Sequence, residues 1–386
     1  MSKTQLEKAM AAISEGRPKE AISLLEKELK SGADDVEMLV YLGIAYVQAE
    51  QPERAVKVLE KAEEEVEDHC ILSLFLGRAY KALGRYEDAV EQLTRAISID
   101  PEILEAWIDL GEIQFKQANY GAVARTLEDA VVRFPEETTL HNLRAMAFHK
   151  LGDYTEAARE WETVYSLSQD SLIALTNYTY SILLMGRTEE AAQFVERARR
   201  LSPGDYRTRV LEAEYAFQLG RMKEAKSLFI SAVNMMPDSI EVLGRLAVLH
   251  HLEGDTTKAS SYLKKAKALA QKEPDGWQRL CPTLQKLETH DELLACLKEA
   301  TRRDIGSAAA WIHLACEYVR RGLTDDALEA WKQSFELRGY IKVHCKVCGK
   351  SFTIPYDARL DLHGVRETSC AHCGDSLAMP ESLAKD

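Results

Sequence analysis

The chain has 386 residues, of which 46% are hydrophobic and 29% charged, a composition typical of a folded protein rather than a disordered one. Its 49 Lys and Arg residues against 62 Asp and Glu give a formal net charge of −13, which disfavours general binding to phosphate backbones. No apolar run is long enough to span a membrane and the first twenty residues contain no apolar signal segment, so we expect a cytoplasmic protein.

A repeat of 34 residues runs through residues 2–341 without an insertion, giving ten copies. In the template copy, residues 70–103, position 8 is small, position 15 is glycine, and positions 20 and 27 are alanine. Position 15 is glycine in seven copies, namely Gly16, Gly84, Gly152, Gly186, Gly220, Gly254 and Gly322. Position 20 is alanine in eight copies, namely Ala21, Ala55, Ala89, Ala157, Ala191, Ala225, Ala259 and Ala327.

Each copy has apolar residues at helical spacing on both sides of position 15, which predicts two antiparallel amphipathic helices. The glycine between them suits a tight turn that needs positive φ. Small residues at positions 8, 20 and 27 allow the helix axes to approach closely. One copy cannot cover its own apolar faces, so the copies are expected to stack into an all-α solenoid.

These positions resemble the tetratricopeptide repeat (TPR) family, whose pattern has a small residue at 8, alanine at 20 and 27, and often proline at 32. The resemblance covers residues 2–341. It implies a right-handed superhelix in which the first helix of each repeat lines a concave groove. It also implies that the chain binds protein or peptide partners.

On the family's geometry, positions 2, 5, 9, 12 and 13 of each repeat face this groove. Its apolar candidates are Met10, Ile13, Val40, Ile44, Val47, Leu74, Ile108, Phe115, Met146, Tyr180, Leu183, Phe217 and Val248. Its basic candidates are Arg78, Lys81, Lys116, His149 and Lys150, with His149 counted for its ring nitrogens. We expect a largely apolar groove with a cationic stretch, although tight winding of the superhelix could bury some of these side chains.

The ninth repeat, residues 274–307, is irregular because Pro282 lies inside its first helix and Leu293 replaces the usual alanine. Two interpretations stay open: drift with compensating repacking, or a bend that orients the C-terminal module. Cys281, Cys296 and Cys316 lie in this region. We expect them to be packing residues, with a redox or metal role as the alternative.

Residues 342–386 form a different, cysteine-rich tail. The pairs Cys345–Cys348 and Cys370–Cys373 have the spacing C-x2-C-x21-C-x2-C, which predicts one structural Zn²⁺ held by four thiolates. The tail resembles a zinc ribbon, with strands expected near 341–345, 351–355 and 366–370. A rubredoxin-like iron site and a redox dithiol are the alternatives for the same ligands.

The sequence therefore favours a non-enzymatic adaptor that binds protein segments in its groove and docks through the zinc ribbon. No phosphate-binding loop or other catalytic motif is present in the sequence. The layout is also similar to TPR/rubredoxin-like regulators of lipopolysaccharide assembly, but without their N-terminal membrane helix and with a longer gap between cysteine pairs. A nucleic-acid factor acting through the ribbon is disfavoured, because the tail has six basic and six acidic residues.

We predict that replacing Cys345 and Cys348 by Ser removes the bound metal and unfolds the tail, because metal binding supplies much of the folding free energy of so small a module. The helicity of the solenoid should stay nearly unchanged. Metal analysis and circular dichroism of the full chain measure the two effects. Equal metal content in the wild type and the variant would contradict the site assignment.

Overall fold

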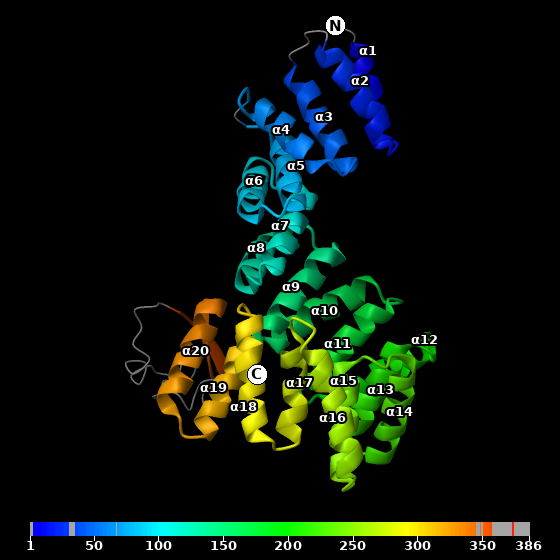
Figure 1. Cartoon of the computed structure of the whole chain (residues 1–386), viewed down its shortest axis with the longest axis vertical. Helices are drawn as coiled ribbons and strands as arrows, with labels where there is room; N and C mark the ends of the chain where they lie inside the picture. The colour runs from blue at the N-terminus through cyan, green and yellow to red at the C-terminus, as the bar shows by residue number, and fades with distance from the viewer. Residues whose placement is uncertain are drawn as a thin grey trace. The chain divides into compact units, whose positions relative to one another are not determined.

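The computed structural model describes residues 3–30, 35–66, 68–344, 348, 350–356 and 373. Twenty α-helices and two β-strands lie in this described part, arranged in helical pairs along the chain (Figure 1). They form two compact units: the first unit contains Met1–Gln117 and Arg125–Leu140, and the second contains Ala118–Ala124 and His141–Asp386. The helical solenoid expected from the repeat is therefore confirmed.

The first unit contains α1 to α7, and α8 and α9 contribute residues to both units. The bounds of these helices are α1 Lys3–Ser14, α2 Pro18–Lys30, α3 Val36–Gln48, α4 Pro52–Glu63, α5 Cys70–Ala82, α6 Tyr86–Ile99, α7 Leu104–Lys116, α8 Tyr120–Arg133 and α9 Thr138–Leu151. Those of the second unit are α10 Tyr154–Leu167, α11 Leu172–Leu184, α12 Thr188–Leu201, α13 Tyr206–Gln218, α14 Met222–Met235, α15 Ile240–Leu252, α16 Thr256–Ala270, α17 Gly276–Lys286, α18 His290–Arg303, α19 Ala308–Arg320, α20 Thr324–Arg338, β1 Tyr340–His344 and β2 Ser351–Pro355. No helix of the described residues is both long enough and apolar enough to cross a membrane.

The turn inside each repeat depends on a left-handed residue at position 15. All seven glycines at this position have φ between +70° and +81°. The three repeats without glycine there adopt the same conformation, with φ of 56°, 56° and 55° at Glu50, Ala118 and Glu288. Because these residues carry a Cβ, the turn is maintained at a conformational cost that glycine avoids. The repeat geometry therefore prevails over the local preference of the residue.

Small residues bring the two helices of a repeat together. A Cβ on Gly43 would lie only 2.4 Å from the Leu59 side chain, and one on Gly77 would lie 2.8 Å from Leu93. The alanines at position 20 are buried along the whole series. The close approach predicted from positions 8 and 20 is thus confirmed, since a larger side chain at Gly43 or Gly77 would force the helices apart.

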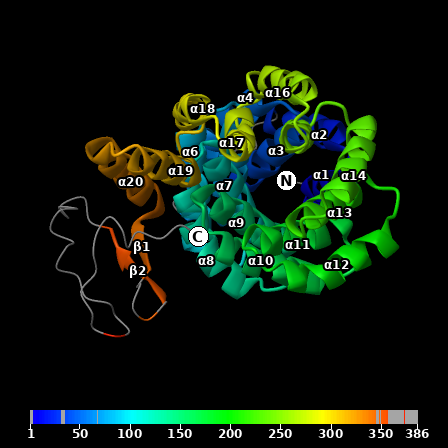
Figure 2. The ribbon, with the colours of Figure 1, turned by 90° about the horizontal axis from the view of Figure 1, so that it is seen from below.

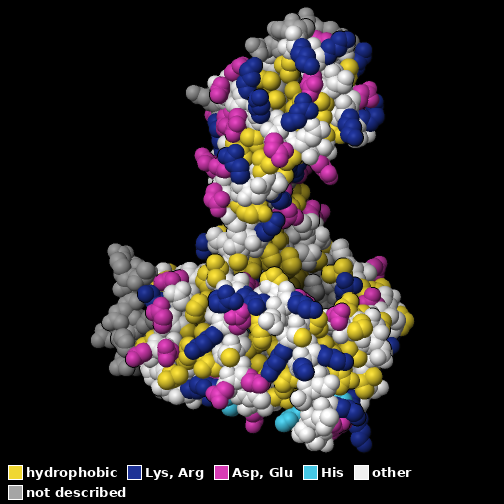
Figure 3. Space-filling view, viewed as in Figure 1, with side chains coloured by type: hydrophobic (Ala, Val, Ile, Leu, Met, Phe, Trp, Pro, Cys, Tyr) yellow, Lys and Arg dark blue, Asp and Glu magenta, His cyan; other side chains and the backbone are white. Residues whose placement is uncertain are grey.

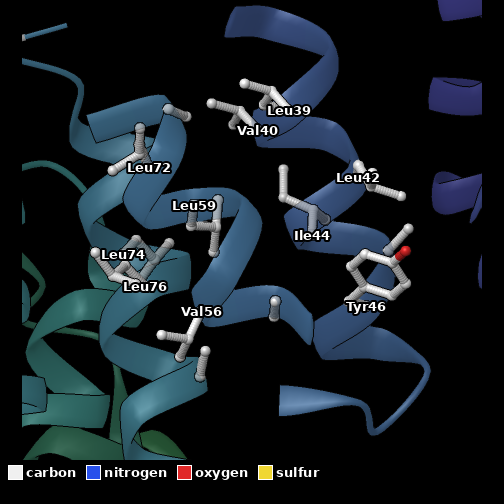
Figure 4. Packing of buried hydrophobic residues seen from close by; sticks show 14 of the residues in the cluster. Leu39, Val40, Leu42, Ile44, Tyr46, Val56, Leu59, Leu72, Leu74 and Leu76 are labelled. Carbon is white, nitrogen blue, oxygen red and sulfur yellow. The ribbon is translucent and has the colours of Figure 1, made fainter. Parts of the chain in front are cut away.

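The first unit buries one continuous hydrophobic cluster, drawn from α1 to α7 (Figure 4). In this cluster Leu59 of α4 is fully buried. Tyrosines at position 11 add a repeated polar contact at its edge. The Tyr46 hydroxyl donates to Glu26 over 2.5 Å, and the equivalent Tyr80 donates to Glu60 over 2.7 Å. Each bond joins a repeat to the one before it, so the stacking is specified by polar contacts as well as by burial.

In the second unit the helices from α10 onward stack in chain order and end in the β1–β2 hairpin beside α20 (Figure 2). The strands pair antiparallel, with Val343 opposite Phe352. Ile341 and Val343 are fully buried in the same hydrophobic cluster as Phe335 of α20. The hairpin is therefore part of the core of this unit.

Two of the three strands expected in the tail are confirmed within one residue, as β1 and β2. The third, expected near 366–370, lies outside the described residues, and the ribbon fold stays a prediction. The boundary placed between 341 and 342 is likewise a prediction. It falls inside β1, whose residues on both sides pack against α20.

The irregular ninth repeat keeps both of its helices, α17 and α18. Helix α17 contains Pro282 and spans only 11 residues. Leu293, which replaces the usual alanine, is 4% exposed and packs in the core with Leu284. The larger side chain thus fills space within the core, as the repacking interpretation requires.

Candidate functional site

The basic groove residues of the first unit are neutralised by acidic neighbours. The Arg78 guanidinium and the Lys81 ammonium each lie 2.6 Å from a different carboxylate oxygen of Asp109. Lys81 also lies 2.6 Å from Glu112. Asp109 and Glu112 occupy positions 6 and 9 of the fourth repeat, so an inspection of the acidic residues along the repeat could have anticipated this pairing. Arg78 and Lys81 thus belong to a charge-balanced network, and the structure does not present them as a cationic stretch.

Lys116 is the predicted basic residue of the first unit that is exposed. Its ammonium lies 5.2 Å from the centre of the Tyr86 ring, and the neighbouring Phe115 is half-buried. Over the surface that faces the viewer in Figure 3, basic and acidic side chains are interspersed with hydrophobic ones. The charge pattern on this face is therefore mixed.

Several apolar residues predicted to line the groove lie in the core. Val40, Ile44 and Leu74 are 2–5% exposed in the first unit, and Leu183 and Val248 are 1–2% exposed in the second. The expectation of an open apolar groove along these positions is wrong. Neighbouring repeats pack closely enough to cover them, which is the alternative that the sequence had left open.

His149 and Lys150, also predicted as groove residues, lie inside the second unit. The Lys150 ammonium, at the end of α9, donates to the Asp304 carboxylate over 2.9 Å and to the Gln278 amide oxygen over 3.4 Å. The Tyr120 hydroxyl donates to the other carboxylate oxygen of Asp304 over 3.1 Å. The side chains of Lys150 and Asp304 are only 17% and 7% exposed. A buried pair with these additional hydrogen bonds holds α9 against the loop that follows α18.

A second set of contacts joins the same parts of the second unit. The Arg338 guanidinium, at the end of α20, donates to the Leu151 carbonyl over 2.7 Å and lies 3.4 Å from the Asp153 carboxylate. Lys342 of β1 lies 3.7 Å from Asp153. Arg338 and Asp153 are almost fully buried. The turn between α9 and α10 is thereby tied to α20 and to the hairpin.

The backbones also approach closely at this closure, as we call the contact of residues 118–124 and 149–154 with residues 275–342. A Cβ on Gly306 would lie 1.6 Å from the Ala118 carbonyl oxygen, a separation that no side chain can tolerate. A Cβ on Gly152 would lie 3.3 Å from the Ala309 Cα atom. Gly306 is therefore required for a different reason from the glycines at position 15: it lets two segments far apart in sequence touch.

His149 is enclosed by this arrangement. Its ring centre lies 5.3 Å from that of Tyr154 and 6.1 Å from that of Trp161. Burial, helped by the nearby positive charge of Lys150, lowers the pKa of His149 to about 4. The imidazole is therefore neutral at physiological pH and acts as a packing group.

An open hollow of about 390 Å³ lies on the inner side of α11, α13, α15 and α17 in the second unit. It is lined by polar and aromatic side chains together with apolar ones, including Asn177, Tyr180, Tyr206, Arg207, Val210 and Met236. Tyr180, predicted from the sequence as a groove residue, thus lies where the structure has a concave surface. The predicted residues Met146 and Phe217 lie outside this lining: Met146 is 39% exposed, and Phe217 is half-buried with the Arg245 guanidinium 5.0 Å from its ring.

The charges around the hollow are matched with one exception. Arg279 forms an ion pair with Glu241, with Nη2 and Oε2 2.8 Å apart. Arg245 forms one with Glu214 over 2.7 Å. Arg207 is exposed and makes no side-chain ion pair with the residues that the structure describes. A ligand that carries a carboxylate could therefore pair with Arg207 without displacing an existing partner.

Two of the four predicted metal ligands, Cys345 and Cys370, lie outside the described residues. Cys348 lies in the turn between β1 and β2 and is partly buried against the core, while Cys373 is exposed. Within the described residues no three His, Cys, Asp or Glu side chains are grouped to hold a metal ion. Four thiolates suit zinc, and a turn between two strands is a position from which a C-x2-C pair can bind it.

Three models of tetratricopeptide repeats match parts of the chain: a TPR repeat model at residues 77–117 and tetratricopeptide repeat models at 114–171 and 216–281. A model described as anaphase-promoting complex, cyclosome, subunit 3 matches residues 14–96. No curated protein was found to match the sequence. Together with the helical pairs, these matches identify the repeats as tetratricopeptide repeats.

Solved structures show the same fold. The C-terminal part of a TPR repeat-containing protein from Cytophaga hutchinsonii matches with a TM-score of 0.54 at 15% identity, over 62% of this chain and 99% of that one. The APC/C hetero-tetramer Cut9–Hcn1 matches at 16% identity over 86% and 80% of the two chains, with a TM-score of 0.40. A structure of Naa15/Naa10 bound to HypK-THB matches at 14% identity over 86% and 63%, with a TM-score of 0.43.

We predict that Asp304→Asn destabilises the second unit by about 3 kcal/mol, because it leaves the buried Lys150 ammonium without its counter-charge. Thermal unfolding of the full chain measures the effect, and hydrogen exchange of residues 304–310 should increase. The double variant Lys150→Met/Asp304→Asn should recover part of the loss, since no buried charge is then unpaired. Arg302→Ala, at the 70% exposed arginine two residues earlier, is the control and should change stability little. Additive effects of the two substitutions would contradict the pairing.

We also predict an acid-dependent loss of stability from His149. Because its pKa is about 4 in the folded chain and near 6.5 in the unfolded chain, the unfolded state binds more protons between these values. The contribution of the neutral imidazole is fully present above about pH 6.5 and is lost as the pH falls towards 4. The difference in unfolding free energy between the wild type and His149→Gln should therefore change across this range. His251→Gln, at an exposed histidine, is the control, and an equal pH dependence for both variants would contradict the assignment.

Proposed function

We propose that this tetratricopeptide repeat protein is a non-enzymatic scaffold in the cytoplasm that binds an extended segment of a partner protein in the hollow of α11, α13, α15 and α17. Its fold is one that forms protein–protein interfaces, and Cut9 and Naa15, named above, occur in assemblies. The proposal places the partner in the second unit, on side chains that the closure leaves accessible.

The observation that carries this proposal is the set of unmatched polar groups in the hollow. The Asn177 side-chain amide and the Tyr180 hydroxyl make no hydrogen bond with the described residues, and Arg207 makes no ion pair with them. An amide side chain offers both a donor and an acceptor, which is what the main chain of an extended segment presents. Leaving such groups unmatched in a partly buried surface is costly, and a bound segment would satisfy them.

The chemistry of the hollow also indicates the kind of segment. The rings of Tyr180 and Tyr206, with the apolar Val210 and Met236, favour an apolar or aromatic side chain. Arg207 favours a carboxylate near it. We therefore expect a segment that combines an apolar residue with an acidic side chain or a C-terminal carboxylate.

For the tail we propose one structural Zn²⁺ bound by Cys345, Cys348, Cys370 and Cys373, with iron as the alternative metal. The spacing of the cysteines supports the proposal, as does the place of Cys348 in a hairpin turn. When bound, the metal would supply folding free energy to the residues that follow β2. The hairpin that carries the first pair packs against α20, so the tail would be held to the solenoid.

We predict that peptides selected for binding to the full chain from a random display library lose at least tenfold in affinity on Tyr180→Ala, because truncating a central aromatic contact removes roughly 1.4 kcal/mol or more. Arg207→Ala should reduce the affinity of acidic peptides and leave that of neutral ones unchanged. Fluorescence anisotropy with labelled peptides measures both effects.

The matched control is Arg200→Ala, an arginine on α12 that is 79% exposed and outside the lining of the hollow. It should bind the selected peptides as the wild type does. If Tyr180→Ala and Arg207→Ala also bind like the wild type, the interface lies elsewhere on the solenoid.

A further inference from the structure

Cys281 and Cys296 form a pair of thiols in the core of the ninth repeat. Cys281 lies on α17 and Cys296 on α18, and their sulfur atoms are 2.9 Å apart. Both side chains are buried, with exposures of 4% and 1%. A disulfide has an S–S distance of about 2.05 Å, so the two sulfurs would have to approach by only roughly 0.9 Å. The helices already hold the thiols where a bond could form.

The pair can be reached from an enclosed cavity. A space of about 140 Å³ lies between the turn that precedes α10 and helices α17 to α19. Cys281 lines this cavity together with Cys316 and His313, whereas Cys296 lies behind it and donates its S–H to the Trp277 carbonyl over 3.1 Å. A reagent in the cavity would therefore meet Cys281 first, and Cys296 second through Cys281.

We propose that Cys281 and Cys296 are a redox-active dithiol, which a peroxide small enough to enter the cavity oxidises to an intramolecular disulfide. The Cys281 sulfur attacks one peroxide oxygen, the O–O bond breaks, and a sulfenic acid and one water form. The Cys296 sulfur then attacks the sulfenic sulfur, which forms the S–S bond and releases a second water. Two thiols lose two electrons and two protons, and one hydrogen peroxide becomes two waters.

The reduced form is compatible with the core in which it lies. Burial raises the pKa of the Cys281 thiol, so the pair is stored as two neutral groups among apolar side chains. Oxidation would connect α17 to α18 covalently across a loop of fourteen residues. Helix α17 also carries Arg279 in the wall of the hollow and Gln278 at the closure. The cross-link would thus restrict the helix that these two features share, and the proposal holds whether or not a peptide binds in the hollow.

The test uses the full chain treated with hydrogen peroxide, then denatured, alkylated with N-ethylmaleimide and digested with trypsin. Cleavage after Arg279, Lys286 and Lys298 places Cys281 in LCPTLQK and Cys296 in LETHDELLACLK. We expect these two peptides joined by a disulfide after oxidation, and separated again after dithiothreitol treatment before alkylation. Recovery of both peptides alkylated and unlinked, or of Cys281 joined to Cys316, would overturn the proposal.

Variants and a second oxidant make the test specific. Cys316→Ser is the matched control, because Cys316 lines the same cavity, and it should leave the cross-link intact. Cys296→Ser should abolish it and leave Cys281 overoxidised or alkylated. Oxidised glutathione, which is larger than the cavity, should react at least tenfold more slowly than hydrogen peroxide at equal concentration, and equal rates would contradict entry through the cavity. The wild-type peptide map decides the main question even if a serine variant fails to fold.

Discussion

The buried ion pair between Lys150 and Asp304 is the interaction on which the second unit depends. Repeats in a solenoid normally contact only their neighbours, so their stability is a sum of local terms. Here the end of α9 meets the loop after α18, and a lysine and an aspartate that are nearly removed from water compensate each other's charge. Tyr120 satisfies the second carboxylate oxygen of Asp304. A solenoid closed in this way has fixed curvature, because α9 to α18 are held between two joined ends.

The two concave features of the second unit follow from this constraint. The hollow with Tyr180 and Arg207 and the cavity beside Cys281 both have a wall on α17, the helix that also provides Gln278 to the closure. A groove on an open solenoid can widen or narrow as repeats flex, but one between joined ends is preorganised. Preorganisation lowers the entropy lost on binding, which favours recognition of a short segment.

Charge has a different role here from the one that the net value of −13 suggests. Arg78, Lys81 and Lys150 are paired with aspartates inside their own units, so they specify how helices pack. Arg207 differs because its partner is missing from the described residues. The unmatched charge, and not the most basic stretch of sequence, therefore indicates where an external group could bind.

The sequence by itself determined the repeat. Its period, the positive φ at position 15 and the close helix pairs at Gly43 and Gly77 all follow from local sterics and from hydrophobic spacing, which a single chain displays directly. Even Glu50, Ala118 and Glu288 obey the pattern. Only the tertiary structure decided that His149 and Lys150 are buried, that Gly306 touches Ala118, and that Cys281 meets Cys296. These contacts join residues that are 15 to 188 positions apart, and their formation depends on the accumulated curvature of many repeats, a quantity that no single repeat encodes.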